Sequence, residues 1–187
     1  MTGPITAGAR PATLWESARR VGAYRWVERR LFECLGGWVA TVPEPSVRAA
    51  LSAHSYHHAW HAELWRDRLP ELAGADPEEL TTPGHPGRAG FMAALERSEG
   101  TAERLVGVYR VLLPRLVVAY RAHLDRASPV SDGPVARALG LVLHDDVEDW
   151  AVGEGLLQAA LTGEDEVGRA ARHQGRLEAM LVSTGGL

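Results

Sequence analysis

The sequence PELAGADPEELTTPGHPGR, residues 70–88, decides how the helices of this chain connect. It contains four Pro and three Gly with little hydrophobic periodicity, which is typical of a connection rather than of a helix. A connection of this length can run along the side of a bundle and start the next helix at the far end. We therefore expect a long crossover here, with helical segments on both sides.

Hydrophobic side chains recur at helical spacing outside this connection, and no alternating strand pattern occurs. This spacing predicts an all-α fold. The order of short loop, long crossover and short loop predicts a four-helix bundle of two antiparallel hairpins joined by a long crossover, plus a short fifth C-terminal helix. Gly100 and Pro114 are expected to kink the third helix. The expected helices cover about 12–42, 44–69, 89–127, 134–161 and 166–182.

The chain has 187 residues, is 45% hydrophobic and carries a formal net charge of −4. We expect one domain over 12–187 after a flexible tail at 1–11. An acidic chain argues against nucleic-acid binding, and no hydrophobic run reaches the roughly 20 residues of a membrane span. The first residues do not resemble a signal peptide, so a cytoplasmic location is expected. The single cysteine, Cys34, excludes an internal disulfide and is expected to be a packed thiol.

Ionisable residues fall on the hydrophobic stripes of two expected helices. Glu28 lies at the centre of the stripe of the first helix, and three histidines share the stripe of the second: His54, His58 and His61. Reflecting the first helix onto the second about the turn at 42–43 places Glu28 within a helical turn of these histidines. His57 is expected at one flank.

The fourth helix carries an acidic run whose orientation the hydrophobic pattern predicts. Asp145 is expected on the face formed by Leu141, Val142, Val152 and Leu156, with Glu148 and Asp149 flanking it. Asp146 and His144 are expected off that face.

Buried carboxylates must be neutralised, paired or bound to a cation. Imidazole and carboxylate together are ligands for iron, manganese or zinc. His58 and His61, at i and i+3, form the better ligand pair, with His54 serving a second ion or an outer shell. Three alternatives stay open: a metal-free polar layer, an ion pair between Glu28 and an arginine, and a solvated acidic face at Asp145 and Glu148.

The helix order and these residues resemble the ferritin-like superfamily of di-iron carboxylate proteins. In the ferritin-like superfamily, two of the four helices each carry one Glu, and the other two each carry a Glu-x-x-His motif. Glu28 matches the first Glu, His58-x-x-His61 occupies the second-helix motif, and Asp145-x-x-Glu148 occupies the fourth. The third helix offers no carboxylate in register. This leaves a mononuclear site and an altered di-metal site as open alternatives.

The resemblance implies an iron- or manganese-dependent oxidase or hydroxylase that acts on a small molecule. Tyr109 and Tyr120 are expected to line its substrate cavity, and a kink at Pro114 is expected to open space for substrate. The alternative is a non-catalytic bundle that acts as a partner or scaffold protein. Trp60 falls off the stripe of its helix, which is compatible with an interface and a homodimer.

Overall fold

The computed structural model describes residues 13–71 and 76–186, and over these residues it is helical without strands, which confirms the all-α class. The predicted tail at 1–11 and the start of the predicted domain at residue 12 lie outside the described residues. Every described helix is too short or too polar to span a membrane. The elements are α1 (Leu14–Val39), α2 (Pro45–Arg66), α3 (Pro77–Leu80), α4 (Pro86–Glu96), α5 (Thr101–Val106), the π-helical η1 (Gly107–Leu112), α6 (Leu113–Leu124), α7 (Gly133–Ala160) and α8 (Glu164–Ser183).

Local sequence signals explain where the long helices begin. Thr13 and Glu16 form a reciprocal capping box at the start of α1. Pro45 and Pro134 stand in the first turns of α2 and α7, where a missing backbone N–H costs nothing. The predicted bounds of these helices and of α8 agree with the structure to within a few residues.

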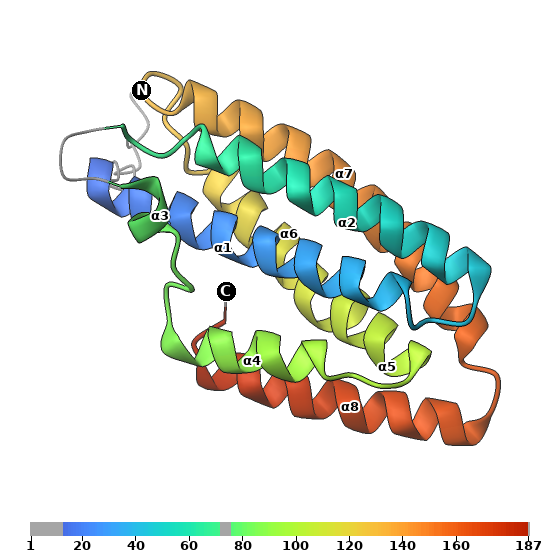
Figure 1. The fold of residues 1–187 in the computed structure, drawn as a ribbon. Helices are drawn as coiled ribbons and strands as arrows, with labels where there is room; N and C mark the ends of the chain where they lie inside the picture. Colours follow the sequence, from blue (N-terminus) through green and yellow to red (C-terminus); the bar gives the residue numbers. More distant parts are fainter. Residues whose placement is uncertain (1–12, 72–75, 187) are drawn as a thin grey trace, which may run out of the picture.

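The third predicted helix is wrong as one continuous element. The chain runs along α4, reverses at residues 97–100, and returns through α5, η1 and α6 (Figure 1). Gly100 is thus a helix start and not a kink. Side chains hold the reversal: Arg104 donates through Nε to the carbonyl of Ser98 and through Nη1 to the Thr41 hydroxyl, each at 2.9 Å.

The helices pack in two groups. In the first, α1 packs against α2, α2 against α7, and α7 against α5 and α6 (Figure 1). In the second, α4 lies beside α8 along one side of the molecule, and α8 also contacts α5 and η1. The segment with α3 and α4 therefore carries the chain from the end of α2 to the start of α5.

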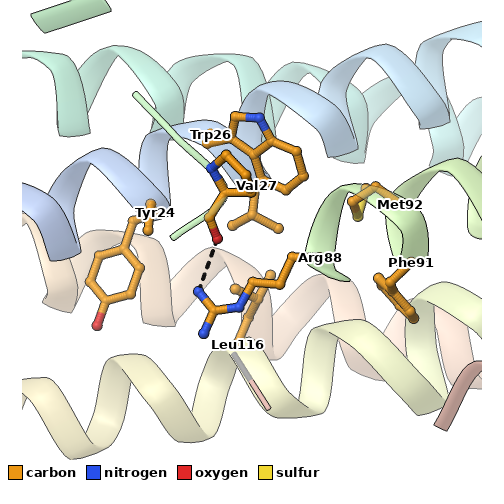
Figure 2. Close-up of a pocket in the computed structure, with 9 residues that line it drawn as sticks. Tyr24, Trp26, Val27, Arg88, Phe91, Met92 and Leu116 are labelled. Carbon is orange, nitrogen blue, oxygen red and sulfur yellow. Dashed lines mark hydrogen bonds between the residues drawn. The ribbon is translucent and has the colours of Figure 1, made fainter. Parts of the chain in front are cut away.

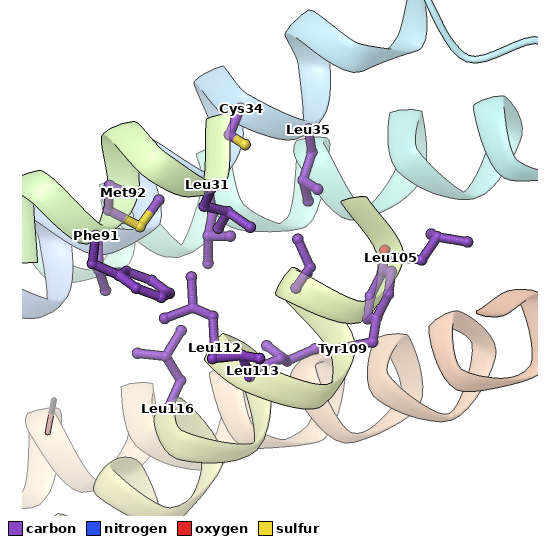
Figure 3. Packing of buried hydrophobic residues seen from close by; sticks show 14 of the residues in the cluster. Leu31, Cys34, Leu35, Phe91, Met92, Leu105, Tyr109, Leu112, Leu113 and Leu116 are labelled. Atoms are coloured by element: carbon purple, nitrogen blue, oxygen red, sulfur yellow. The ribbon is translucent and has the colours of Figure 1, made fainter. Parts of the chain in front are cut away.

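One hydrophobic cluster joins both groups. Figure 3 shows side chains of α1, α4, η1 and α6 meeting at its centre, among them Leu31, Met92 and Leu112. The hydrophobic stripe that the sequence predicts on the third helix is buried throughout: Leu105, Tyr109, Leu112, Leu113, Leu116 and Tyr120. The stripe that it predicts on the first helix, which includes Leu31, Phe32 and Leu35, is confirmed except at Phe32, which is 45% exposed. Cys34 is a buried free thiol, and burial raises its pKa, as expected of a packed residue.

Candidate metal site

The helical phase of α7 differs from the sequence prediction. Of the residues that define the predicted face, Leu141 and Val152 are 38% and 50% exposed, whereas Val142 is buried, so the buried face is rotated from the predicted one. The residues that share the buried face instead recur every three to four positions: Ala138, Leu139, Val142, Leu143, Asp146, Asp149, Gly153 and Leu157. The expectation that Asp146 lies off the core face is therefore wrong, because this face carries two aspartates and a glycine where the prediction relied on large hydrophobic side chains.

Glu28 lies fully buried at the centre of α1 and bonds to two other elements. The ring N–H at Nδ1 of His58, on α2, donates to its Oε2 at 2.6 Å. The Tyr120 hydroxyl, on α6, donates to its Oε1 at 2.5 Å. Both oxygens of Glu28 thus have hydrogen-bond donors, and the alternative of an arginine partner for Glu28 finds no ion pair among the described residues.

His61 faces three carboxylates. Its Nε2 lies 3.1 Å from Asp145 Oδ2, while its Nδ1 lies 3.6 Å from Glu28 Oε2 and 3.7 Å from Asp146 Oδ1. The latter two distances are too long for hydrogen bonds. Consequently Nδ1 of His61 is buried and has no hydrogen-bond partner among the described residues.

Asp146 is the least satisfied group in this region. Its side chain is 0% exposed, and neither of its carboxylate oxygens has a hydrogen-bond partner among the residues that the structure describes. Buried carboxylate oxygens without partners are rare, because desolvation is costly. One ligand atom from each of Glu28, His58, His61 and Asp146 lies within 4.8 Å of the others. These four residues are donors of the kind that iron, manganese and zinc bind.

Burial and mutual charge set the protonation of this cluster. Burial raises the pKa of Asp146 well above its usual range, and the negative charge of Glu28 raises it further. Burial also acts to raise the pKa of Glu28, but His58 and His61 outweigh it and hold this pKa below its usual range. Burial acts to lower the pKa of His61, whereas Glu28 and Asp146 raise it to about 9. Protons on His61 and Asp146 thus offset the negative charge of Glu28, and a bound cation would displace these protons.

A second polar group adjoins the first on the α2 and α7 faces. His54 Nδ1 lies 2.7 Å from the Tyr109 hydroxyl, and its Nε2 lies 3.3 Å from Asp149 Oδ1. His57, at the predicted flank, points Nδ1 to Asp149 Oδ2 at 2.9 Å. Asp149 therefore joins two histidines, while His54 lies outside the four-residue cluster. Burial lowers the pKa of His54 to about 4, against the opposing charge of Asp149.

Asp145 and Glu148, the two metal ligands that the sequence predicts on α7, lie in different surroundings. Asp145 borders the cluster, with 21% of its side chain exposed and one contact to His61. Glu148 points to solvent, with its side chain 68% exposed, and its nearest basic partner is His144. The helical spacing that places Glu148 outside places Asp146 and Asp149 inside. The hydrophobic residues of this helix do not mark that face, so the sequence pattern alone gave no signal for Asp146 and Asp149.

A surface hollow borders Tyr109, the residue whose hydroxyl contacts His54. It has a volume of about 570 Å³ and is lined by residues that include Tyr109, Pro114, Val147 and Trp150. Pro114 lacks an N–H and stands directly after the π-helical turn. The hollow thus adjoins Pro114, where a kink was expected to open space for substrate, and Tyr109, itself 1% exposed, both lines the hollow and contacts His54.

No protein-family model, curated protein or solved structure matches this chain. The geometry of the cluster is therefore what the functional argument rests on.

Proposed function

We propose that this protein is a ferritin-like four-helix bundle that binds a metal ion through Glu28, His58, His61 and Asp146. The observation that carries the proposal is the pair of unpartnered, fully buried oxygens on Asp146, which face His61 and Glu28. A cation would satisfy these oxygens and the free Nδ1 of His61 together. Two nitrogen and two carboxylate donors suit iron or manganese.

The helix order supports the bundle assignment. In Figure 1, α1 and α2 run in opposite directions, the segment with α4 returns along the molecule, and α5–α6 and α7 again run in opposite directions. Two antiparallel hairpins joined by a long crossover have this order. In the proposed bundle α4 belongs to the crossover, and α5, η1 and α6 together form the third helix.

We propose further that the site serves an oxidase or hydroxylase that acts on a small molecule. Iron or manganese, when bound, would supply the redox chemistry for activating dioxygen. The hollow beside Tyr109 and Pro114 has the size of a small-molecule site. Tyr109 would separate substrate from the histidines, and Tyr120 would orient Glu28 through its hydroxyl.

Metal analysis of matched variants tests the site. Protein reconstituted with Fe²⁺ without oxygen, or with Mn²⁺, is expected to retain about one ion per chain after desalting. Asp146→Asn is expected to lose most of this metal while remaining folded, because the amide preserves shape and removes the buried acid. Glu148→Gln, on the exposed side of the same helix, is the control and is expected to retain the metal.

Two results would contradict the proposal. One is a metal content far below one ion per chain in the reconstituted wild type. The other is equal metal loss in the Asp146 and Glu148 variants. Oxygen consumption by the iron-loaded protein then tests the oxidase assignment separately from metal binding.

The non-catalytic alternative rests on exposed aromatic residues of α2. Tyr56 and Trp60 are 71% and 41% exposed, and exposed aromatic side chains are typical of protein interfaces. If the protein is a scaffold, a double His58→Ala, His61→Ala variant would preserve its cellular role. Loss of that role in a folded double variant would contradict this alternative.

A further inference from the structure

A groove rich in arginine lies away from the metal cluster. It has a volume of about 670 Å³ and runs between the start of α1, the segment around residue 84, α6 and the C-terminal glycines. None of the described residues that line it is acidic, although the whole chain carries a net charge of −4. The lining includes five of the 20 basic residues of the chain: Arg19, Arg20, Arg88, Arg115 and Arg126.

Arg88 is fixed at the inner end of this groove. Its Nε donates to the carbonyl of Gly186 at 3.1 Å. Its Nη1 donates to the carbonyl of Pro83 at 3.2 Å, which is the dashed line in Figure 2. The side chain is half-buried and pairs with no carboxylate among the described residues. Two carbonyl groups orient this guanidinium without neutralising it. A partly buried cation without a counter-charge favours binding of an anion.

Arg20 of α1 and Arg126, which follows α6, line the same groove as Arg88 and Tyr24. Burial raises the pKa of Tyr24 to about 12, and the charges that oppose this rise belong to Arg20, Arg126 and Arg88. The positive charges of all three arginines thus lower the pKa of Tyr24, in the direction opposite to burial. Arg20 and Arg126 form no ion pair with any described residue, so their positive charges are uncompensated within the described part of the chain. The groove thus combines three cations with a hydroxyl donor.

The floor of the groove is hydrophobic. Pro114, Val118, Ala119 and Ala122 of α6 line it, and Val118 is 68% exposed. Tyr24 and Arg88 also line a second hollow, together with residues such as Trp26 (Figure 2). This second hollow has a volume of only about 20 Å³. This inner hollow holds little more than a water molecule. The hydrophobic part of a ligand would therefore lie along the floor.

We propose that this groove binds a small amphipathic anion, with a carboxylate or phosphate group held by Arg20, Arg88 and Arg126. The Tyr24 hydroxyl would donate to the same group, and the hydrophobic body would cover Val118 and Ala119. The volume is that of a small-molecule site. A nucleic acid or an anionic membrane is less suited, because the net negative charge of the protein outside this groove would repel such a large anionic surface. The proposal does not depend on metal binding.

Titration calorimetry with defined probes tests the proposal on the full chain. The probes are decanoate and decyl phosphate below their micelle concentrations, inorganic phosphate, and decanol as the uncharged control. We expect decanoate or decyl phosphate to bind at one site, and the tighter of the two identifies the preferred anionic group. Inorganic phosphate and decanol are expected to bind at least about tenfold more weakly, because each lacks one half of the recognised chemistry.

Arginine variants locate the binding. An Arg20→Gln, Arg126→Gln double variant changes surface positions, so it is expected to fold and to weaken binding at least about tenfold through lost charge-assisted hydrogen bonds. Arg121→Gln, on the exposed side of α6 and outside the groove, is the matched control and is expected to bind as the wild type does.

Several results would overturn the proposal. These are no saturable binding of either amphipathic anion, equal binding of decanol or inorganic phosphate, and equal weakening by Arg121→Gln. Tighter binding of duplex DNA or of phosphatidylserine vesicles through the same arginines would also overturn it, since the groove would then serve a macromolecular surface.

Discussion

Glu28 is the residue through which three helices meet at the candidate metal site. His58 of α2 and Tyr120 of α6 each donate to one of its oxygens. Tyr120 reaches it from the third helix of the proposed bundle, where the ferritin-like pattern would have a carboxylate. A phenol at this position provides a hydrogen-bond donor in place of a metal ligand. The site therefore has fewer carboxylates than a di-iron centre.

Removal of this phenol is expected to destabilise the protein. Tyr120→Phe takes the donor from Glu28 Oε1 and leaves a buried carboxylate oxygen without a partner. We expect a loss of about 1–3 kcal/mol in the free energy of unfolding of the metal-free protein, measured by urea denaturation. Tyr56→Phe is the control, since Tyr56 is 71% exposed. Equal stability of Tyr120→Phe and wild type would show that the contact contributes little.

His123 gives the stability of the protein a pH dependence. Burial, with a smaller contribution from Arg20, lowers its pKa from 6.5 to about 4. Between these pH values the unfolded chain binds a proton that the folded chain does not. The stability from the neutral, buried imidazole is therefore fully present above about pH 6.5 and decreases as the pH falls toward about 4.

A variant isolates this contribution. His123→Phe keeps a ring beside Tyr24 and removes the titrating group, so the decrease in Tm from pH 7.5 to pH 5 is expected to become smaller by a few degrees. His144→Gln changes an exposed histidine and is the control. If both variants have the pH dependence of the wild type, His123 does not carry the effect.

At the scale of elements, α7 and η1 fit together through a glycine. A Cβ at Gly153 would lie only 2.2 Å from the ring of Tyr109. Tyr109 belongs to the π-helical turn and contacts His54 through its hydroxyl. A glycine at 153 thus allows the Tyr109 ring to reach the polar group across α7. Such π-helical turns occur frequently at functional sites.

Two alanine substitutions in α7 are expected to have opposite effects. Gly153→Ala forces a buried ring to move and is expected to destabilise the protein by about 1–3 kcal/mol. Gly155→Ala meets nothing within 4 Å and is expected to stabilise it by about 0.5–1 kcal/mol through helix propensity. Chemical denaturation of both variants measures this. The close packing at Tyr109 would be refuted if Gly153→Ala were as stable as Gly155→Ala.

The sequence predicts the buried face correctly for α1 and α2 but wrongly for α7. On α1 and α2 the large hydrophobic residues around Glu28 and the histidines mark the buried stripe correctly. On α7 the exposed face carries Leu141 and Val152, while the buried face carries Asp146, Asp149 and Gly153. Hydrophobic periodicity could not identify a buried face whose central residues are acidic or lack a side chain.

At the scale of the whole molecule, one buried arginine holds the proposed crossover, the segment that contains α3, against α1. Arg25 donates to Glu78 Oε1 at 2.5 Å and to the Thr81 hydroxyl at 2.8 Å. Close to it, a Cβ at Gly22 would lie 2.0 Å from the carbonyl oxygen of Leu80. The backbone of the crossover thus lies directly against α1, which sets the route of the chain toward α4.

Loss of this arginine is expected to loosen the crossover. Arg25→Met keeps the buried side-chain volume and removes the hydrogen bonds, so amide exchange in α3 is expected to accelerate by about tenfold or more. Exchange in α2 and α7 is expected to change little. Arg29→Met is the control, because Arg29 contacts the same Glu78 from an exposed position. Unchanged α3 exchange in Arg25→Met would show that other contacts hold the crossover.

Local sequence signals predict the all-helical class, the bounds of α1, α2, α7 and α8 to within a few residues, and the presence of Glu28, His58 and His61 on buried faces. These features follow from local periodicity and from proline and glycine signals, which each segment carries alone. The tertiary structure decided the reversal at residues 97–100 and the choice of Asp146 over Glu148. Both depend on contacts between distant segments: Arg104 with Thr41 at the reversal, and the α2 histidines with α7. A helix presents whichever face its neighbours cover, and only the packed molecule contains those neighbours.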